Sequence, residues 1–329
     1  MDSFGMASAW SLGLRFVGQR PAGHALILIG IGVLAPFLLE VAVTGGPVDS
    51  VAPAMPGRAE LGARLAPAWP LLLVTAAGYW LQTGSYFASW RLGFGAARSS
   101  LGGAILYGLV AGLLATIVVA IVAIVAMFGA GRFWSPDAVI LGALILLLPL
   151  SLVCALFYTL MATLVAAAAA LLLFAAMAFG TVVGDVGFAA TMVGGRGDIV
   201  VLLLVVCGVM MWLAARLSCA TSAMAERRSL NLLAALRDSW RLTWEEQWAI
   251  LRYLALIGFA LALVILGAGL AVGAGATNFL PQMAGPTQQA GAVALRLALA
   301  IPFAFLAVMV PAGIYRELTR ADMSAEIFA

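Results

Sequence analysis

Residues of the types that carry out acid–base, nucleophilic or metal chemistry are few in this chain. His24 is its single histidine, and its three cysteines, Cys154, Cys207 and Cys219, lie in or beside apolar runs without CxxC spacing. A zinc site or a catalytic triad needs partners that the neighbouring sequence does not supply. The sequence therefore predicts no catalytic residue, no metal site and no cofactor. We expect a protein that is not an enzyme, with His24 at a membrane interface.

The most polar stretch inside an apolar run is GYWLQTGSYFASW. Its polar side chains fall within eight positions and are Tyr79, Gln82, Thr83, Ser85 and Tyr86. In hydrocarbon, an amide such as that of Gln82 needs a partner on another helix or a water-filled cavity. Two interpretations stay open: hydrogen bonding between helices, and a helix that lines the path of a transported substrate.

Glu40 and Arg296 are ionisable residues within long apolar runs. Such a group costs about 2.5 to 3.5 kcal/mol at the centre of a membrane, and it is usually paired or functional. Both residues are expected near the outer ends of their runs, where a long side chain can reach the interface by itself. The sharper hypothesis is an ion pair that joins the first and last helices.

The elements that carry these residues are apolar helices. Hydrophobic residues make up 64% of the 329 positions and charged residues only 9%, against about a quarter charged in a typical soluble domain. The apolar residues form runs of about 20, which is the length of helix that crosses a bilayer. They do not alternate with polar residues, as the strands of a membrane barrel would. The predicted fold class is all-α: a polytopic transmembrane helix bundle forming a single membrane domain over residues 1–329.

About eight spans are expected, and the first is expected to be a retained helix and not a cleaved signal peptide. We place the spans at about 23–43, 69–90, 101–129, 139–157, 160–180, 199–217, 248–273 and 291–315. A short interfacial helix over 6–20 and a cytoplasmic amphipathic segment over 225–244 accompany them. The run 138–180 has no charge, and as one straight helix it would measure roughly 65 Å. We therefore divide it into two spans, with one long kinked helix as the alternative.

The arginines indicate the orientation, because cytoplasmic loops of membrane proteins carry an excess of basic residues. With eight spans and both termini in the cytoplasm, twelve of the 17 basic residues lie on or near the cytoplasmic side of the membrane: Arg15, Arg20, Arg91, Arg98, Arg216, Arg227, Arg228, Arg237, Arg241, Arg252, Arg316 and Arg320. All basic residues are Arg, and topology accounts for most of them. No nucleic-acid partner is expected.

Short repeated motifs and spaced glycines suggest how the helices are organised. The sequence SWRL occurs at 89–92 and again at 239–242, and a looser version, AWSL, occurs at 9–12. A duplicated helix unit would explain them, and so would the preference of Trp and Arg for any bilayer boundary. Gly108 and Gly112 have the GxxxG spacing that allows close helix packing.

Residues 216–260 carry a family resemblance. Arg216 is followed by a short apolar stretch, Glu226, the sequence ALRDSWRLT and a Trp-containing start to the next span. Together with AWSLGLRF near the N-terminus and YREL near the C-terminus, this pattern resembles the membrane-domain family named after glycerophosphoryl diester phosphodiesterases. The resemblance implies a multi-pass bacterial membrane protein of poorly defined function. It does not imply phosphodiester hydrolysis, which belongs to a separate soluble domain with a His pair and metal-binding carboxylates.

These observations leave three functions from different classes. The first is a non-enzymatic structural or interaction component that contacts membrane lipids, another membrane protein or a second copy of itself. The second is a small transporter or permease whose path runs past Gln82, and the third is an intramembrane lipid-modifying enzyme. A hydrated cavity at mid-membrane beside Gln82 would indicate the transporter, whereas a closely packed interior would indicate the first function.

Overall fold

The computed structural model describes residues 4–44, 69–95, 100–130, 208–209, 211–278 and 286–328. Every regular element in these ranges is a helix, so the all-α class is confirmed for them. Residues 211–217 are helical, and the named elements are α1 (Met6–Gly18), α2 (Pro21–Ala25), the π-helix η1 (Leu26–Leu34), α3 (Ala35–Thr44), α5 (Trp69–Phe94), α6 (Leu101–Ala130), α11 (Ala220–Arg227), α12 (Leu232–Leu242), α13 (Gln247–Asn278) and α14 (Pro286–Phe328).

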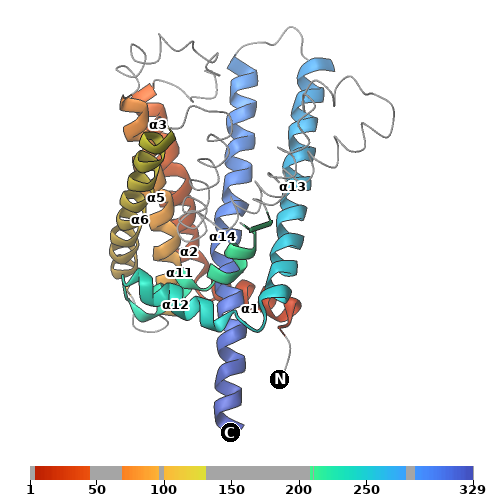
Figure 1. Ribbon diagram of the computed structural model, residues 1–329. Coiled ribbons are helices and arrows are strands. Elements are labelled where there is room, and N and C mark those ends of the chain that lie inside the picture. Colours follow the sequence, from red (N-terminus) through yellow and green to blue (C-terminus); the bar gives the residue numbers. More distant parts are fainter. Residues whose placement is uncertain are drawn as a thin grey trace.

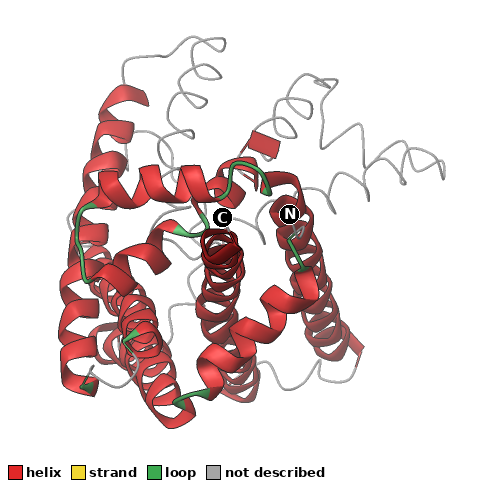
Figure 2. Cartoon of the chain, turned by 90° about the horizontal axis from the view of Figure 1, so that it is seen from below, coloured by secondary structure: helices red, strands yellow, loops and turns green. Residues whose placement is uncertain are grey.

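The long helices run alongside one another, and shorter helices close one end of them (Figure 1). Helices α3, α5 and α6 lie together on one side, α14 passes through the middle and α13 lies on the other side. Helices α1, α11 and α12 gather at the lower end in this view, as does the C-terminal end of α14; we call this end the α12 end. Seen from that end, shorter helices lie across the ends of the long helices, which are viewed along their axes (Figure 2).

Two described helical segments are long and apolar enough to cross a membrane, judged by length and composition. They are Pro21–Val43 and Arg296–Arg320. The apolar segments Leu101–Ile117 and Gln247–Leu261 are shorter. The expected spans over 139–157 and 160–180, and most of the span over 199–217, lie outside the described residues. The bundle of eight spans therefore stays a prediction.

The first expected span, 23–43, is not a uniform α-helix. It consists of α2, the nine-residue π-helix η1 and α3. A π-helical stretch is rare and usually limited to a single turn. Within it, Gly32 lies so close to α5 that an added Cβ would come within 2.4 Å of the Ser85 hydroxyl oxygen. This glycine therefore allows the close approach of η1 and α5.

The amphipathic segment expected over 225–244 is divided between two helices, the end of α11 and α12. Arg228 has a positive φ of 55° and ends α11, and the Ser229 amide donates to the Met224 carbonyl at 3.1 Å, as in a Schellman motif. The Asn231 side chain then caps α12 by accepting from the Ala234 amide at 3.1 Å. Ser and Asn satisfy helix ends better than helix interiors, which explains the break.

Small residues let several helices approach closely. A Cβ added to Gly108 of α6 would lie 2.3 Å from the Gly84 carbonyl oxygen of α5, and one added to Gly112 would lie 2.6 Å from the Gly84 nitrogen. The close packing predicted for Gly108 and Gly112 is therefore confirmed. Helices α1 and α14 meet in the same way, because a Cβ on Gly313 would lie 2.2 Å from the Ala9 carbonyl oxygen. Because alanine and glycine are small, the backbones of α5 and α14 approach those of their partner helices closely at these crossings.

Candidate functional site

The polar residues expected to form a site on α5 make hydrogen bonds along their own helix. The Gln82 side-chain amide donates to the Tyr86 hydroxyl at 3.0 Å, and the Ser85 hydroxyl donates to the Gln82 carbonyl at 2.6 Å. Thr83, Ser85 and Tyr86 are buried, whereas Tyr79 and Gln82 are half-buried. These two bonds need neither a substrate nor a second helix to satisfy the groups that make them.

Glu40 and Arg296 are brought together by α3 and α14. Nη1 and Nη2 of Arg296 donate to the two carboxylate oxygens of Glu40 at 3.1 and 2.8 Å. Helix α3 and the N-terminal part of α14, which carry the pair, lie at the end opposite the α12 end (Figure 1). A bidentate arginine–carboxylate contact fixes geometry as well as charge, and here it joins an early helix to the last one.

His24 is fully buried among the described helices, and its position at a membrane interface stays a prediction. Its Nδ1 lies 2.5 Å from the Ser89 hydroxyl oxygen, and its ring packs at 5.5 Å from the ring of Phe16. Its Nε2 has no hydrogen-bond partner among the described residues. The residue connects α2 to α5, and the ring of Phe16 from α1 packs against it.

The most unusual charged side chain in the described residues is Arg216, which is fully buried. Its Nη1 donates to the Thr243 hydroxyl over a long 3.4 Å, and its Nε and Nη2 have no hydrogen-bond partner among the described residues. The guanidinium carbon lies 4.2 Å from the ring centroid of Trp240 and 4.7 Å from that of Trp244. A buried cation is thus held against two indole rings without a carboxylate partner.

Helix α12 is positioned over Arg216 by hydroxyl groups one turn apart. The Ser239 hydroxyl donates to the Arg216 carbonyl at 2.8 Å and accepts from the Cys219 amide at 3.3 Å. The Thr243 hydroxyl lies 3.1 Å from the Arg216 carbonyl and 2.8 Å from the Ser239 carbonyl, so its single proton serves one of them at a time. Because these two residues face inward, Trp240 and Trp244 are placed beside the guanidinium.

Burial of this cation has a substantial energetic cost. Transferring an ion out of water costs several kcal/mol even after the protein relaxes. A desolvated cation–π contact returns about 2 kcal/mol, so the rings of Trp240 and Trp244 offset part of that cost. The remaining N–H groups of Arg216 still lack acceptors, and a planar guanidinium fork is suited to two oxygens of a phosphate or carboxylate. The arrangement is therefore chemically fit to bind an oxyanion.

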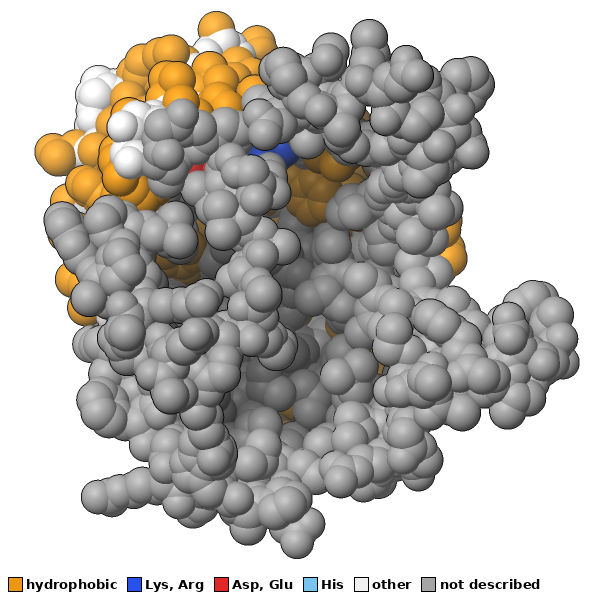
Figure 3. Space-filling view, turned by 90° about the horizontal axis from the view of Figure 1, so that it is seen from above, with side chains coloured by type: hydrophobic (Ala, Val, Ile, Leu, Met, Phe, Trp, Pro, Cys, Tyr) orange, Lys and Arg blue, Asp and Glu red, His pale blue; other side chains and the backbone are white. Residues whose placement is uncertain are grey.

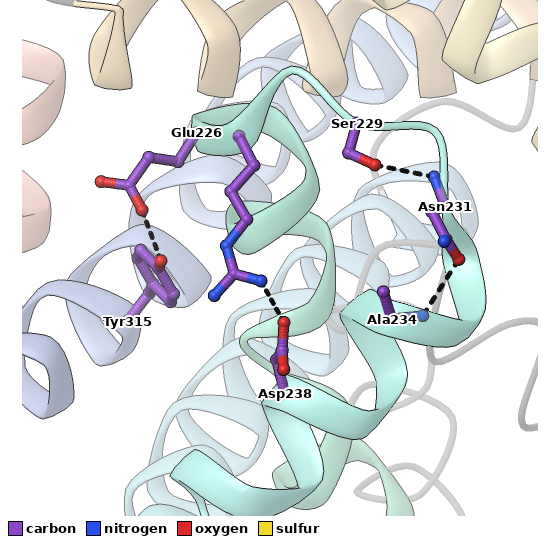
Figure 4. A network of polar contacts seen from close by, with 7 residues as sticks. Glu226, Ser229, Asn231, Ala234, Asp238 and Tyr315 are labelled. Atoms are coloured by element: carbon purple, nitrogen blue, oxygen red, sulfur yellow. Dashed lines mark hydrogen bonds and ion pairs between the residues drawn. The ribbon is translucent and has the colours of Figure 1, made fainter.

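Other charged groups around α11 already have partners. Nη1 of Arg91, from α5, donates to the Ala225 and Glu226 carbonyls at 3.0 and 3.1 Å, where the negative end of the α11 dipole favours a cation. Figure 4 shows the Tyr315 hydroxyl donating to the Glu226 carboxylate and the ion pair that joins Arg227 to Asp238. These contacts tie α5, α11, α12 and α14 together, whereas one edge of the buried Arg216 guanidinium has no acceptor among the residues that the structure describes.

Cys219 and the acidic residues do not form a reactive centre in the part of the chain that the structure describes. Burial raises the pKa of the Cys219 thiol to about 12, so at neutral pH it remains the weakly nucleophilic thiol. Within the same ranges, no group of three His, Cys, Asp or Glu side chains is placed to hold a metal ion. The chemistry available at the α12 end is binding of charge.

The sequence did not single out Arg216 as a site. It included Arg216 among the arginines that indicate orientation, and it placed Trp240 within the amphipathic segment expected over 225–244. The available signal was an arginine at the end of an apolar run, followed by two tryptophans at helical spacing in the next amphipathic segment.

Comparison of the chain with models of protein families, with characterised proteins and with solved structures gives no match. The resemblance to the phosphodiesterase-associated membrane domains therefore stays a prediction, and function has to be argued from the chain itself.

Proposed function

We propose that this chain is a multi-pass α-helical protein of a bacterial inner membrane that works without catalysis, as a structural or interaction component in contact with lipid. The observation that carries the proposal is the apolar outer surface of its helices. Leu38 of α3, Leu106 of α6 and Leu256 of α13 are 62%, 66% and 63% exposed. A soluble protein rarely exposes large contiguous apolar patches, whereas lipid-facing helices do so by necessity.

The distribution of exposed side chains over the molecule supports this placement. Viewed from the end opposite the α12 end, most of the described side chains in sight are hydrophobic, with basic and acidic atoms visible among them (Figure 3). At the α12 end, Trp240, Trp244 and Trp248 are exposed, and Arg237 and Arg241 are exposed beside them. Tryptophan with arginine is typical of a membrane–water interface. The bilayer boundary would then run along α12.

The position of the chain ends supports the proposed orientation. Helix α1 and the C-terminal end of α14 both lie at the α12 end (Figure 1), together with Arg91, Arg216 and Arg227. An even number of spans, such as eight, leaves both termini on one side of the membrane. The concentration of arginines there favours the cytoplasmic side.

A fractionation experiment with topology reporters tests the proposal. The chain should sediment with membranes, resist extraction with alkaline carbonate and dissolve only with detergent. Fluorescent protein fused after Arg228 should fluoresce, and alkaline phosphatase fused after Glu60 should be active because that loop is expected outside. Recovery of the chain in buffer without detergent would contradict the proposal, and active phosphatase after Arg228 would contradict the orientation.

A further inference from the structure

We infer that Arg216 is the anchor of a phosphate-binding site at the α12 end, with the phosphate held by the edge of its guanidinium between the Trp240 and Trp244 side chains. The phosphate can come from two sources. The first is a lipid head group, and for that source the inference rests on the proposed membrane placement. The other source is free inorganic phosphate. The chemistry of recognition is the same for both.

The unpartnered nitrogens of Arg216 are the pair that suits an oxyanion. Nε and Nη2 carry N–H groups on the same edge of the guanidinium, pointing in nearly parallel directions, and both are buried without a hydrogen-bond partner in the described chain. This edge presents two donors at the spacing of two oxygens on one phosphate. The third nitrogen, Nη1, is turned the other way and already contacts Thr243 at 3.4 Å.

Three other arginines in the described part of the chain contrast with Arg216. Arg91 donates to two carbonyls of α11, Arg227 pairs with Asp238, and Arg296 pairs with Glu40 through both terminal nitrogens. Each of them thus has an acceptor within the chain, although Arg227 and Arg296 are exposed and Arg216 is not. Buried polar groups in folded proteins are almost always satisfied, so the open edge of Arg216 indicates an acceptor from beyond the described residues.

A ligand can reach Arg216 through the side chains that cover it. Trp240 is 36% exposed and Trp244 is 59% exposed, so the guanidinium lies directly beneath surface indoles whose rotation would open it. Arg237 and Arg241 are exposed on α12 and attract anions to this surface. Leu233, Trp248 and Leu256 are also exposed there or on the adjoining α13, and they offer apolar contacts to the acyl chains of a phospholipid.

Three probes separate the possible ligands in a titration of the full chain purified in an uncharged maltoside detergent. They are dioleoylphosphatidylglycerol, dioleoylglycerol without a phosphate, and inorganic phosphate alone. Binding is followed by native mass spectrometry and by the shift in melting temperature. The site predicts that a phosphate-bearing probe binds and stabilises the protein, and that dioleoylglycerol does neither. Preference for phosphatidylglycerol identifies a lipid head group as the source, and saturation by inorganic phosphate alone identifies the free ion.

Matched variants assign the binding to Arg216. Arg216→Met removes the charge but keeps an apolar stem, and it should weaken phosphate binding at least about tenfold, as expected for loss of a bidentate charged contact. Arg15→Met removes the same charge from the exposed side of α1 and should change the affinity by less than about threefold. Should Arg216→Met fail to fold, Arg216→Lys keeps the positive charge without the Nε–Nη2 edge, and it should still lose most of the affinity.

Equal binding of dioleoylglycerol and phosphatidylglycerol would overturn the inference, as would unchanged phosphate affinity in Arg216→Lys or Arg216→Met. Either result with the chain still in the membrane fraction removes the phosphate site and leaves the proposed function standing. Recovery of the chain in detergent-free buffer removes the proposed function instead.

Discussion

The two SWRL segments have the same four residues and opposite surroundings. In the first, Ser89, Trp90, Arg91 and Leu92 are all buried at the end of α5. In the second, which lies in α12, the serine is buried but Trp240 and Arg241 are exposed. A tetrapeptide typical of membrane boundaries is therefore used once inside the fold and once on its surface.

The two segments differ in what their tryptophan and arginine side chains contact. The Trp90 indole donates to the Val308 carbonyl at 3.0 Å, and Arg91 donates to the end of α11. In α12 the indole ring of Trp240 instead covers Arg216, while Arg241 points outward. The first segment thus holds helices together, and the second provides a surface. The origin of the two segments in a duplicated helix unit stays a prediction.

Substitution of the two arginines should give the largest difference between the segments. Arg91→Met leaves the Ala225 and Glu226 carbonyls without their donor, and it should destabilise the folded chain by about 2 to 4 kcal/mol. The equivalent change in the second segment, Arg241→Met, should stay within about 0.5 kcal/mol because the side chain is exposed. Denaturant unfolding of both variants in the same detergent compares them. Equal losses would mean that the segments do not differ as described.

The two tryptophans should show a smaller difference in the same direction. Trp90→Phe keeps an aromatic ring but removes the donor to the Val308 carbonyl, which should lower the free energy of unfolding by about 1 to 2 kcal/mol. Trp240→Phe keeps a ring over Arg216 and should lower it by less than about 1 kcal/mol. The measurement is again the unfolding free energy, and a larger loss for Trp240→Phe would reverse the assignment of roles.

The Glu40–Arg296 pair lies outside both segments and serves as a reference, because its guanidinium also has acceptors within the chain. Substitution of this pair should change the stability least. Arg296→Glu places two carboxylates together and should destabilise the chain by about 1 kcal/mol. The double exchange Glu40→Arg with Arg296→Glu restores opposite charges and should recover at least about half of that loss. Thermal unfolding of the single and double variants measures the coupling, and no recovery would reject an energetic role for the pair.

The sequence predicted best what depends on local pattern. Apolar runs predicted helices, and the spacing of Gly108 and Gly112 predicted a close helix crossing that α5 and α6 make. The break at Arg228 was missed although Ser229 and Asn231 are residues that favour helix ends.

The candidate site could not be predicted because it depends on tertiary packing. Arg216 and Trp240 are far apart in sequence and meet only because Ser239 and Thr243 bind the Arg216 carbonyl. The polar residues of α5 suggested a site, yet the Gln82 and Ser85 side chains donate hydrogen bonds within their own helix. Composition indicates how many polar groups lie in apolar surroundings, and only the fold determines which of them lacks an acceptor.

The measurement that tests the account most directly is the accessibility of α12 across a membrane. A cysteine introduced as Arg241→Cys, in a chain whose three native cysteines are replaced by alanine, can be labelled with a membrane-impermeant maleimide. The account predicts labelling in inside-out membrane vesicles and none in intact cells until they are permeabilised. Labelling from outside intact cells would contradict the cytoplasmic position of the α12 end, and labelled protein free in buffer would contradict the membrane placement itself.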